Sequence, residues 1–226
     1  MFGITGFGAA LFTIPLATHL VPLEFALALF VLCDLACALR VGFENPKNAL
    51  RAEWTRLVPM IALGTAVGAT LLVNLPRQAA TAALGIFIVA YALYSLVKPV
   101  VGKPISPAWA WLAGFAGGVT STVFGAGGPP YIIYLSRRGL EPAQLRATMG
   151  FATLTSISLR AVAFLLTGLL LDPRVWLAAA AAVPAALAGI AVARRVYLRI
   201  SRPLLMRLFA LVLLASGGSL LWRSMH

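Results

Sequence analysis

Three features of the chain could do chemistry, and all three lie within apolar sequence. The run FGAGGPP at 124–130 is made largely of helix-breaking residues, yet apolar stretches flank it on both sides. Asp34 and Arg160 each lie well inside a separate apolar stretch. Charged residues at such depth are costly in lipid, and by default they face the interior of a helix bundle and have a pairing or functional role.

The breaker run is predicted to offer backbone amides to a ligand. Glycine lets the backbone approach a bound group closely, because no Cβ is in the way. Proline can begin a short helix without adding an unsatisfied amide, and the first turn of such a helix attracts an anion. The residues expected to bind an anion are Gly125, Gly127, Gly128, Pro129, Ser121, Thr122 and Arg160, together with Gly8 and Thr5 near the start of the chain.

Two roles are open for the charged pair. Arg160 could balance the charge of an anionic substrate, and Asp34 is the only acid at depth and hence the obvious carboxylate for proton coupling. The alternative is that Asp34 and Arg160 pair with each other, or with backbone, and have no part in transport. Cys33 and Cys37 are interpreted as small buried hydrophobic residues, and Tyr131 and Tyr134 as anchors at the membrane interface.

No residues at depth form a Ser–His pair, paired carboxylates or a metal-binding cluster, so neither catalysis, a metal nor a cofactor is predicted. The composition instead indicates an integral membrane protein: 61% of the 226 residues are hydrophobic and 11% are charged, far from an ordinary soluble domain. Apolar runs long enough for a bilayer are found at 2–22, 23–43, 56–75, 78–97, 108–136, 143–171, 173–193 and 203–222. Their Leu-, Ala- and Gly-rich sequences are typical of helices.

The chain has the pattern of a duplicated unit. FGAAL at 7–11 resembles FGAGG at 124–128, and at the same offset LEFA at 23–26 resembles LEPA at 140–143. Internal repeats are typical of secondary transporters, whose substrate site lies between the halves. We therefore expect two membrane repeats of four hydrophobic segments each, at 1–102 and 103–226.

The basic residues indicate how segment 108–136 lies in the membrane. The net charge of +12 is attributed to cytoplasmic loops, which are rich in Lys and Arg, rather than to a nucleic-acid partner. If all eight segments cross, the loops on the two faces carry eight and nine basic residues. If 108–136 turns at the Gly-Pro run and leaves on the side it entered, the counts become fourteen and three, with Arg160 left inside the membrane. The three are Arg77, Arg174 and Arg223.

The uneven count favours a re-entrant hairpin at 108–136 over a single kinked span. Each repeat would then be a Gly-rich broken hairpin followed by three transmembrane helices, an odd number of crossings, so the second repeat is inverted relative to the first. The loops at 44–56 and 194–202 would both be cytoplasmic.

These motifs resemble those of the TauE/SafE family of sulfite and organosulfonate exporters, which is grouped with the toluene sulfonate uptake permeases. GITGFGAALFTIPLA at 3–17 is similar to the first Gly-rich motif of the family, and GGVTSTVFGAGGPPYIIYL at 117–135 to the second. LRATMG at 145–150 also fits. The chain departs from the family at 9–11, where AAL stands in place of the usual glycines.

The resemblance implies a secondary transporter of the inner membrane that moves small sulfur-containing anions, such as sulfite, thiosulfate or organosulfonates, in some cases coupled to protons. Its partners would be a small anionic substrate and the lipid bilayer, with a homo-oligomer left open. Two alternatives remain: an anion channel of the same architecture, and an intramembrane protein with no transport role.

Overall fold

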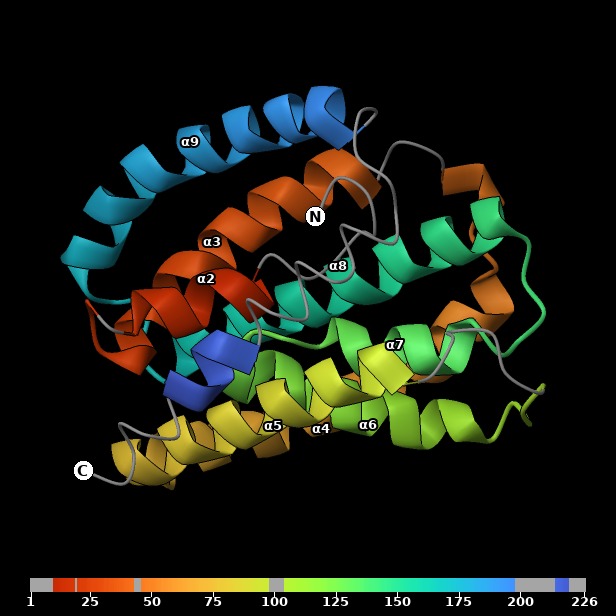
Figure 1. Ribbon diagram of the computed structural model, residues 1–226, viewed down its shortest axis with the longest axis horizontal. Coiled ribbons are helices and arrows are strands. Elements are labelled where there is room, and N and C mark those ends of the chain that lie inside the picture. Colours follow the sequence, from red (N-terminus) through yellow and green to blue (C-terminus); the bar gives the residue numbers. More distant parts are fainter. Residues whose placement is uncertain (1–9, 19, 43–45, 98–103, 198–213, 220–226) are drawn as a thin grey trace.

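The computed structural model describes residues 10–18, 20–42, 46–97, 104–197 and 214–219. These residues form helices joined by short connections, and no strand is found among them. The helices lie roughly along one long axis (Figure 1). The prediction of an all-α protein is therefore confirmed for the described part of the chain.

The helices of the first half follow the predicted apolar segments. They are α2 (Ala10–Ala17), α3 (Leu23–Gly42), the short 3-10 helix η1 (Pro46–Asn48), α4 (Arg51–Asn74) and α5 (Arg77–Val97). Because α4 begins at Arg51, residues 51–56 of the predicted loop 44–56 belong to a helix instead. Residues 44 and 45 of that loop lie outside the described part.

The described helices of the second half also follow the predicted apolar segments, with 108–136 divided into two helices. Its helices are α6 (Trp109–Phe124), α7 (Gly128–Leu135), α8 (Pro142–Leu166) and α9 (Pro173–Tyr197), and residues 214–219 are also helical. Since α9 extends to Tyr197, residues 194–197 of the predicted loop 194–202 are helical. The remainder of that loop lies outside the described part.

Two of the described helices, α4 and α8, are long and apolar enough to cross a membrane by length and composition. Shorter apolar stretches occupy Gln78–Tyr94 in α5 and Pro173–Gly189 in α9. Proline lies inside α4 at Pro59 and inside α9 at Pro184. Both helices continue through it, which membrane helices tolerate when neighbours satisfy the freed backbone groups.

The two ends of the bundle gather different parts of the chain. Helices α4, α6 and α8 begin at one end (the right in Figure 1), where the Leu50 amide donates to Thr148 Oγ1 at 3.0 Å. The opposite end gathers the α2–α3, α4–α5 and α8–α9 connections. Arg138 and Glu53 meet at the end where α4 begins. At the opposite end, Arg77 is the first residue of α5 and Arg174 is the second residue of α9.

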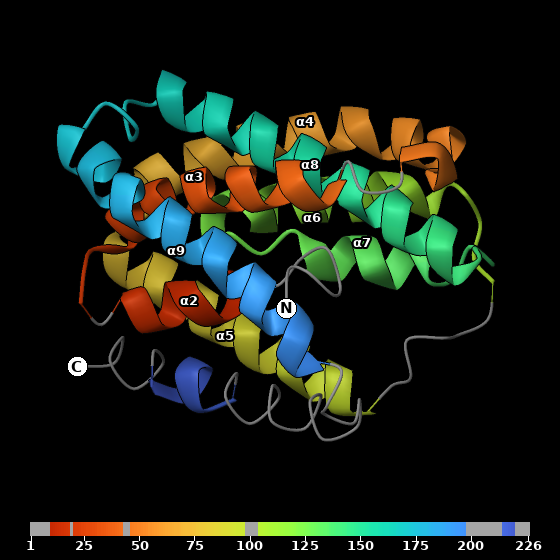
Figure 2. The same cartoon turned by 90° about the horizontal axis from the view of Figure 1, so that it is seen from above.

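The Gly-Pro run turns the chain back on itself. Helix α6 ends at Phe124, and Gly125 adopts a left-handed conformation with φ of 69°, which glycine reaches without a steric penalty. Helix α7 then returns, so that the Ile105 amide donates to the Arg137 carbonyl at 3.2 Å. The two arms of the hairpin therefore start and finish side by side, rather than forming one kinked helix (Figure 2).

A seam of glycines joins α6 to α4, and this pair of helices makes the most extensive contact between the described elements. A Cβ built on Gly118 would lie 2.5 Å from the Ile61 carbonyl oxygen, and one on Gly64 would lie 2.2 Å from the Phe115 carbonyl oxygen. Gly68 and Gly114 are equally crowded by α6 and α4 respectively. This glycine seam (Gly64, Gly68, Gly114 and Gly118) lets the two backbones approach closely, as small-xxx-small patterns do in membranes.

Candidate functional site

A buried ion pair joins α3 to α8 inside the bundle. Arg160 Nη2 lies 2.8 Å from Asp34 Oδ2, and the two residues are 1% and 5% exposed. The sequence left two roles open for these residues, and the structure shows that they do pair with each other. The pair is electrically neutral as a unit, which is the form in which charges are retained away from water.

Arg160 also contacts the hairpin. Its Nη1 donates to the Ser121 carbonyl on α6 at 2.8 Å. The same carbonyl accepts the Gly125 amide at 2.9 Å, so one oxygen links the guanidinium to the turn. Arg160 Nε is buried and has no hydrogen-bond partner among the described residues. A guanidinium with an unused donor is a place where one more acceptor can bind.

The hairpin tip contributes fewer free amides than its glycines suggest. The amides of Gly125 and Ala126 donate to the Ser121 and Thr120 carbonyls, which closes the end of α6. Gly127 precedes α7 and Gly128 begins it, and their amides donate to no other described residue. Gly125 thus shapes the turn, while the amides of Gly127 and Gly128 have no acceptor among the described residues.

Pro129 has the predicted position near the start of α7, where its missing amide removes an orphan donor. A Cβ on Gly127 would lie 2.8 Å from both the Gly117 carbonyl oxygen and Ser121 Cβ. The tip therefore lies directly against the turn of α6 that binds Arg160. In this way Ser121 brings Gly127 and Arg160 together.

The predicted hydroxyl groups are placed unequally. Ser121 is buried beside the tip. Thr122 Oγ1 donates to the Gly118 carbonyl of its own helix at 2.9 Å, so its hydroxyl proton is already used. Gly8 and Thr5 lie outside the described residues.

Two tyrosines of α7 are not interface anchors, contrary to the sequence interpretation. Tyr131 is completely buried, lies against Gly117, and donates to Ser156 Oγ at 3.0 Å. Tyr134 is 1% exposed and donates to the Glu53 carboxylate. Their position near a segment end suggested the membrane surface, but the hairpin turns that end into the bundle.

The second tyrosine belongs to a polar cluster that sequence reasoning missed. Glu53 Oε1 accepts hydrogen bonds from Arg138 Nε at 3.1 Å and Nη2 at 3.0 Å, and from Arg56 Nη1 at 3.0 Å. Arg138 Nη1 also donates to the Ile105 carbonyl at 2.6 Å. The Glu53 carboxylate raises the pKa of the Arg138 guanidinium above its ordinary value. The Glu53 cluster (Glu53, Arg56, Tyr134 and Arg138) thus fastens both arms of the hairpin to the start of α4.

No signal in the sequence points to this cluster, because Glu53 and Arg138 are 85 positions apart. The described residues also contain no group of three or more His, Cys, Asp or Glu side chains that could hold a metal ion. Cys33 and Cys37 are free and buried on α3, as expected of small hydrophobic residues.

Comparison of the chain with known proteins shows the family to which it belongs. No solved structure matches the chain. A relative named "Probable inner membrane transporter protein TsaS", from Comamonas testosteroni, is 29% identical over 203 residues, which cover 86% of this chain and 83% of the relative. Another, named "Probable sulfite/organosulfonate exporter TauE", from Cupriavidus necator, is 27% identical over 231 residues, which cover 96% of this chain and 87% of the relative. Residues 1–220 match the family model described as "Sulfite exporter TauE/SafE", and the chain therefore belongs to this family of membrane transport proteins.

Proposed function

We propose that this protein is a secondary transporter of the inner membrane that moves small sulfur-containing anions such as sulfite, thiosulfate or organosulfonates. The observation that carries the proposal is the buried Arg160 guanidinium beside the hairpin tip, with Nε free of any described partner. The free amides of Gly127 and Gly128 at the start of α7 supply further donors for an oxyanion. The printed names of the two relatives agree with an anionic sulfur compound as substrate.

The architecture proposed for transport is a pair of inverted repeats, at 1–102 and 103–226. The order and lengths of the helices support it: α2 precedes α3 as α7 precedes α8, and α3 and α8 have 20 and 25 residues. The next pair, α4 and α9, have 24 and 25. In this proposal the hairpin enters the membrane and leaves on the cytoplasmic side, where the basic loops 44–56 and 194–202 also lie.

Asp34 is proposed to couple anion binding to a proton. In the structure the Asp34 carboxylate occupies the ionic contact that an anionic substrate would need on Arg160. Two negative groups cannot share one buried guanidinium without a large electrostatic cost. An arriving anion would therefore displace Asp34, and the displaced carboxyl group would take up a proton rather than stay buried and charged.

Purified protein in proteoliposomes tests the function directly. We expect saturable uptake of radiolabelled sulfite or an organosulfonate, with accumulation that follows a pH gradient. Arg160→Gln is expected to abolish the flux. Because that change leaves the Asp34 carboxylate buried without a counter-charge, the double variant Asp34→Asn/Arg160→Gln is expected to fold better and is used for the same flux measurement. Lys47 is exposed, so Lys47→Gln serves as a control.

The same assay separates the alternatives. Flux that never saturates and ignores the pH gradient would identify an anion channel instead of a carrier. Saturable flux that persists in Asp34→Asn/Arg160→Gln would overturn the site. Retained exchange without accumulation in Asp34→Asn is the expected signature of proton coupling through Asp34.

A further inference from the structure

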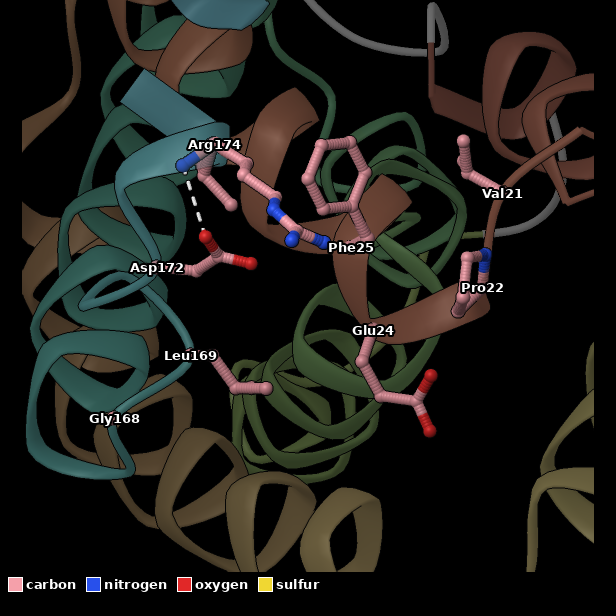
Figure 3. Close-up of a pocket in the computed structure, with 9 residues that line it drawn as sticks. Val21, Pro22, Glu24, Phe25, Gly168, Leu169, Asp172 and Arg174 are labelled. Atoms are coloured by element: carbon pink, nitrogen blue, oxygen red, sulfur yellow. Dashed lines mark hydrogen bonds between the residues drawn. The ribbon is translucent and has the colours of Figure 1, made fainter. Parts of the chain in front are cut away.

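A pocket opens at the end of the bundle opposite the Glu53 cluster. Its volume is about 550 Å³, and it lies where the α2–α3 and α8–α9 connections meet (Figure 3). Phe25, Leu169 and Val175 form apolar walls, and Glu24, Asp172 and Arg174 bring charge to it. This volume is within the range of about 300–1,000 Å³ that is typical of small-molecule sites. We call it the end pocket.

The end pocket lies at one end of the two helices that carry the buried ion pair. Its walls come from the start of α3 and from the chain just after α8, and these two helices carry Asp34 and Arg160. Phe25 precedes Asp34 by a helical distance of about 13 Å, and Leu169 follows Arg160 by a similar number of residues. The pocket and the buried ion pair are therefore formed by the same two helices, and the Glu53 cluster lies at the opposite end of the bundle.

Arg174 supplies an available positive charge. Its guanidinium forms no hydrogen bond or ion pair with any described residue, although its backbone amide donates to Asp172 Oδ1 at 2.9 Å. Figure 3 shows the guanidinium extending past Phe25, with the Glu24 carboxylate directed away from it. Arg174 is also one of only three basic residues that the charge count assigns to this face, where Lys and Arg are scarce in membrane proteins.

The carboxylates of Asp172 and Glu24 in the end pocket each lie at the start of a helix. Asp172 accepts the Arg174 amide at the start of α9, and Glu24 lies in the first turn of α3. Acidic groups at these positions offset the positive end of the helix dipole. A guanidinium beside an aromatic and aliphatic wall suits an anion that carries an apolar body, since the charged head and the body find separate partners.

We propose that the end pocket is a second anion-binding station, in which Arg174 binds the sulfonate group and the apolar wall binds the body of an organosulfonate. Its role as a station on the path to Arg160 rests on the proposed transport function. The binding of a ligand in the end pocket does not depend on that function. The headgroup of an anionic lipid shares this chemistry, and the experiment below separates the two sources.

Binding is measured first, by isothermal titration of an aryl sulfonate into Asp34→Asn/Arg160→Gln protein, in which the central site is disabled. We expect binding that Arg174→Gln weakens about fivefold, the effect of one partly exposed ionic contact. Glu24→Gln should strengthen binding, because it removes a negative charge from the same pocket. Equal affinity for the aryl sulfonate with and without Arg174→Gln or Glu24→Gln would overturn the proposal of a second binding station.

Transport kinetics in phosphatidylcholine liposomes then test its place on the path. Arg174→Gln is expected to raise KM for the aryl sulfonate and to leave kcat unchanged. Leu169→Ala should raise KM for the aryl sulfonate but not for sulfite, which has no apolar body. An unchanged KM in both variants would show that the pocket is off the path.

Repeating the titration with phosphatidylglycerol tests the lipid. If this lipid abolishes aryl sulfonate binding, the pocket is a lipid site and the proposal is wrong. If wild-type protein transports no anion yet the titration shows Arg174-dependent binding, the transport function fails while the binding site stands. The two failures are therefore distinguishable.

Discussion

Two buried carboxylates of this protein are bound in different ways. Glu53, at the start of α4, accepts hydrogen bonds from two arginines and a tyrosine. Asp34, in the middle of α3, is paired with Arg160. Arg138 in the first cluster holds both the carboxylate and the Ile105 carbonyl, whereas Arg160 has a buried Nε without a described partner.

The difference indicates which cluster is structural and which one can change partners. A polar network in which each member is satisfied rigidifies the elements it joins, and exchanging a partner would only weaken it. A single ion pair with a spare donor loses less when one anion replaces another. This difference fits a Glu53 cluster that holds the hairpin, and it supports the proposal that the Asp34–Arg160 pair exchanges partners with a ligand.

The largest effect is expected from removing one partner of the central pair. Arg160→Gln leaves the Asp34 carboxylate buried without a counter-charge, which should lower the free energy of unfolding by about 3–5 kcal/mol. Asp34→Asn/Arg160→Gln should recover most of this loss, because no unpaired charge remains. Thermal unfolding of the purified proteins measures both. A double variant as unstable as the single one would assign the pair a structural role like that of Glu53.

Removing the charge of Glu53 is expected to have the next largest effect. Glu53→Gln weakens the contacts to Arg138, Arg56 and Tyr134, which should cost about 2–3 kcal/mol in unfolding free energy. Because no described contact joins Glu53 to Arg160, the folded variant should keep the substrate affinity of the wild type. Thermal unfolding and substrate titration check the two parts, and a large change in affinity at constant stability would contradict the assignment.

The glycine seam packs α4 against α6 and should be sensitive to a single methyl group. Gly118→Ala places a Cβ 2.5 Å from the Ile61 carbonyl oxygen, and such overpacking costs about 1–3 kcal/mol. Gly189→Ala is the matched control, since no atom of the described residues lies within 4 Å of its Cβ. Unfolding temperatures of the two variants in the same detergent give the comparison. Equal stability would show that α4 and α6 are further apart than described.

The smallest effect is expected at the rim of the Glu53 cluster. The Arg56 side chain is 45% exposed, so the loss of its ion pair in Arg56→Gln should cost less than about 1 kcal/mol. The same thermal unfolding assay applies, with the addition of salt as a second variable. If the loss equals that of Glu53→Gln, the cluster depends on Arg56 rather than on Arg138.

Local sequence was sufficient to predict the helices and the break between α6 and α7, whereas the count of basic residues over the whole chain favoured a hairpin over a kink. Apolar length sets helix positions in a membrane protein, and the closely spaced glycines and prolines of 124–130 favour a break in the helix. These features depend on residues that are neighbours in the chain, so the sequence by itself determined them.

Contacts between distant segments were decided only by the tertiary structure. The sequence brought Asp34 and Arg160 to notice but left their pairing open, since 126 positions separate them. It gave no sign of the Glu53 cluster and misplaced Tyr131 and Tyr134 at the membrane surface. Which turn of one helix meets which turn of another depends on how closely the backbones approach, and here the glycine seam and the hairpin set that register.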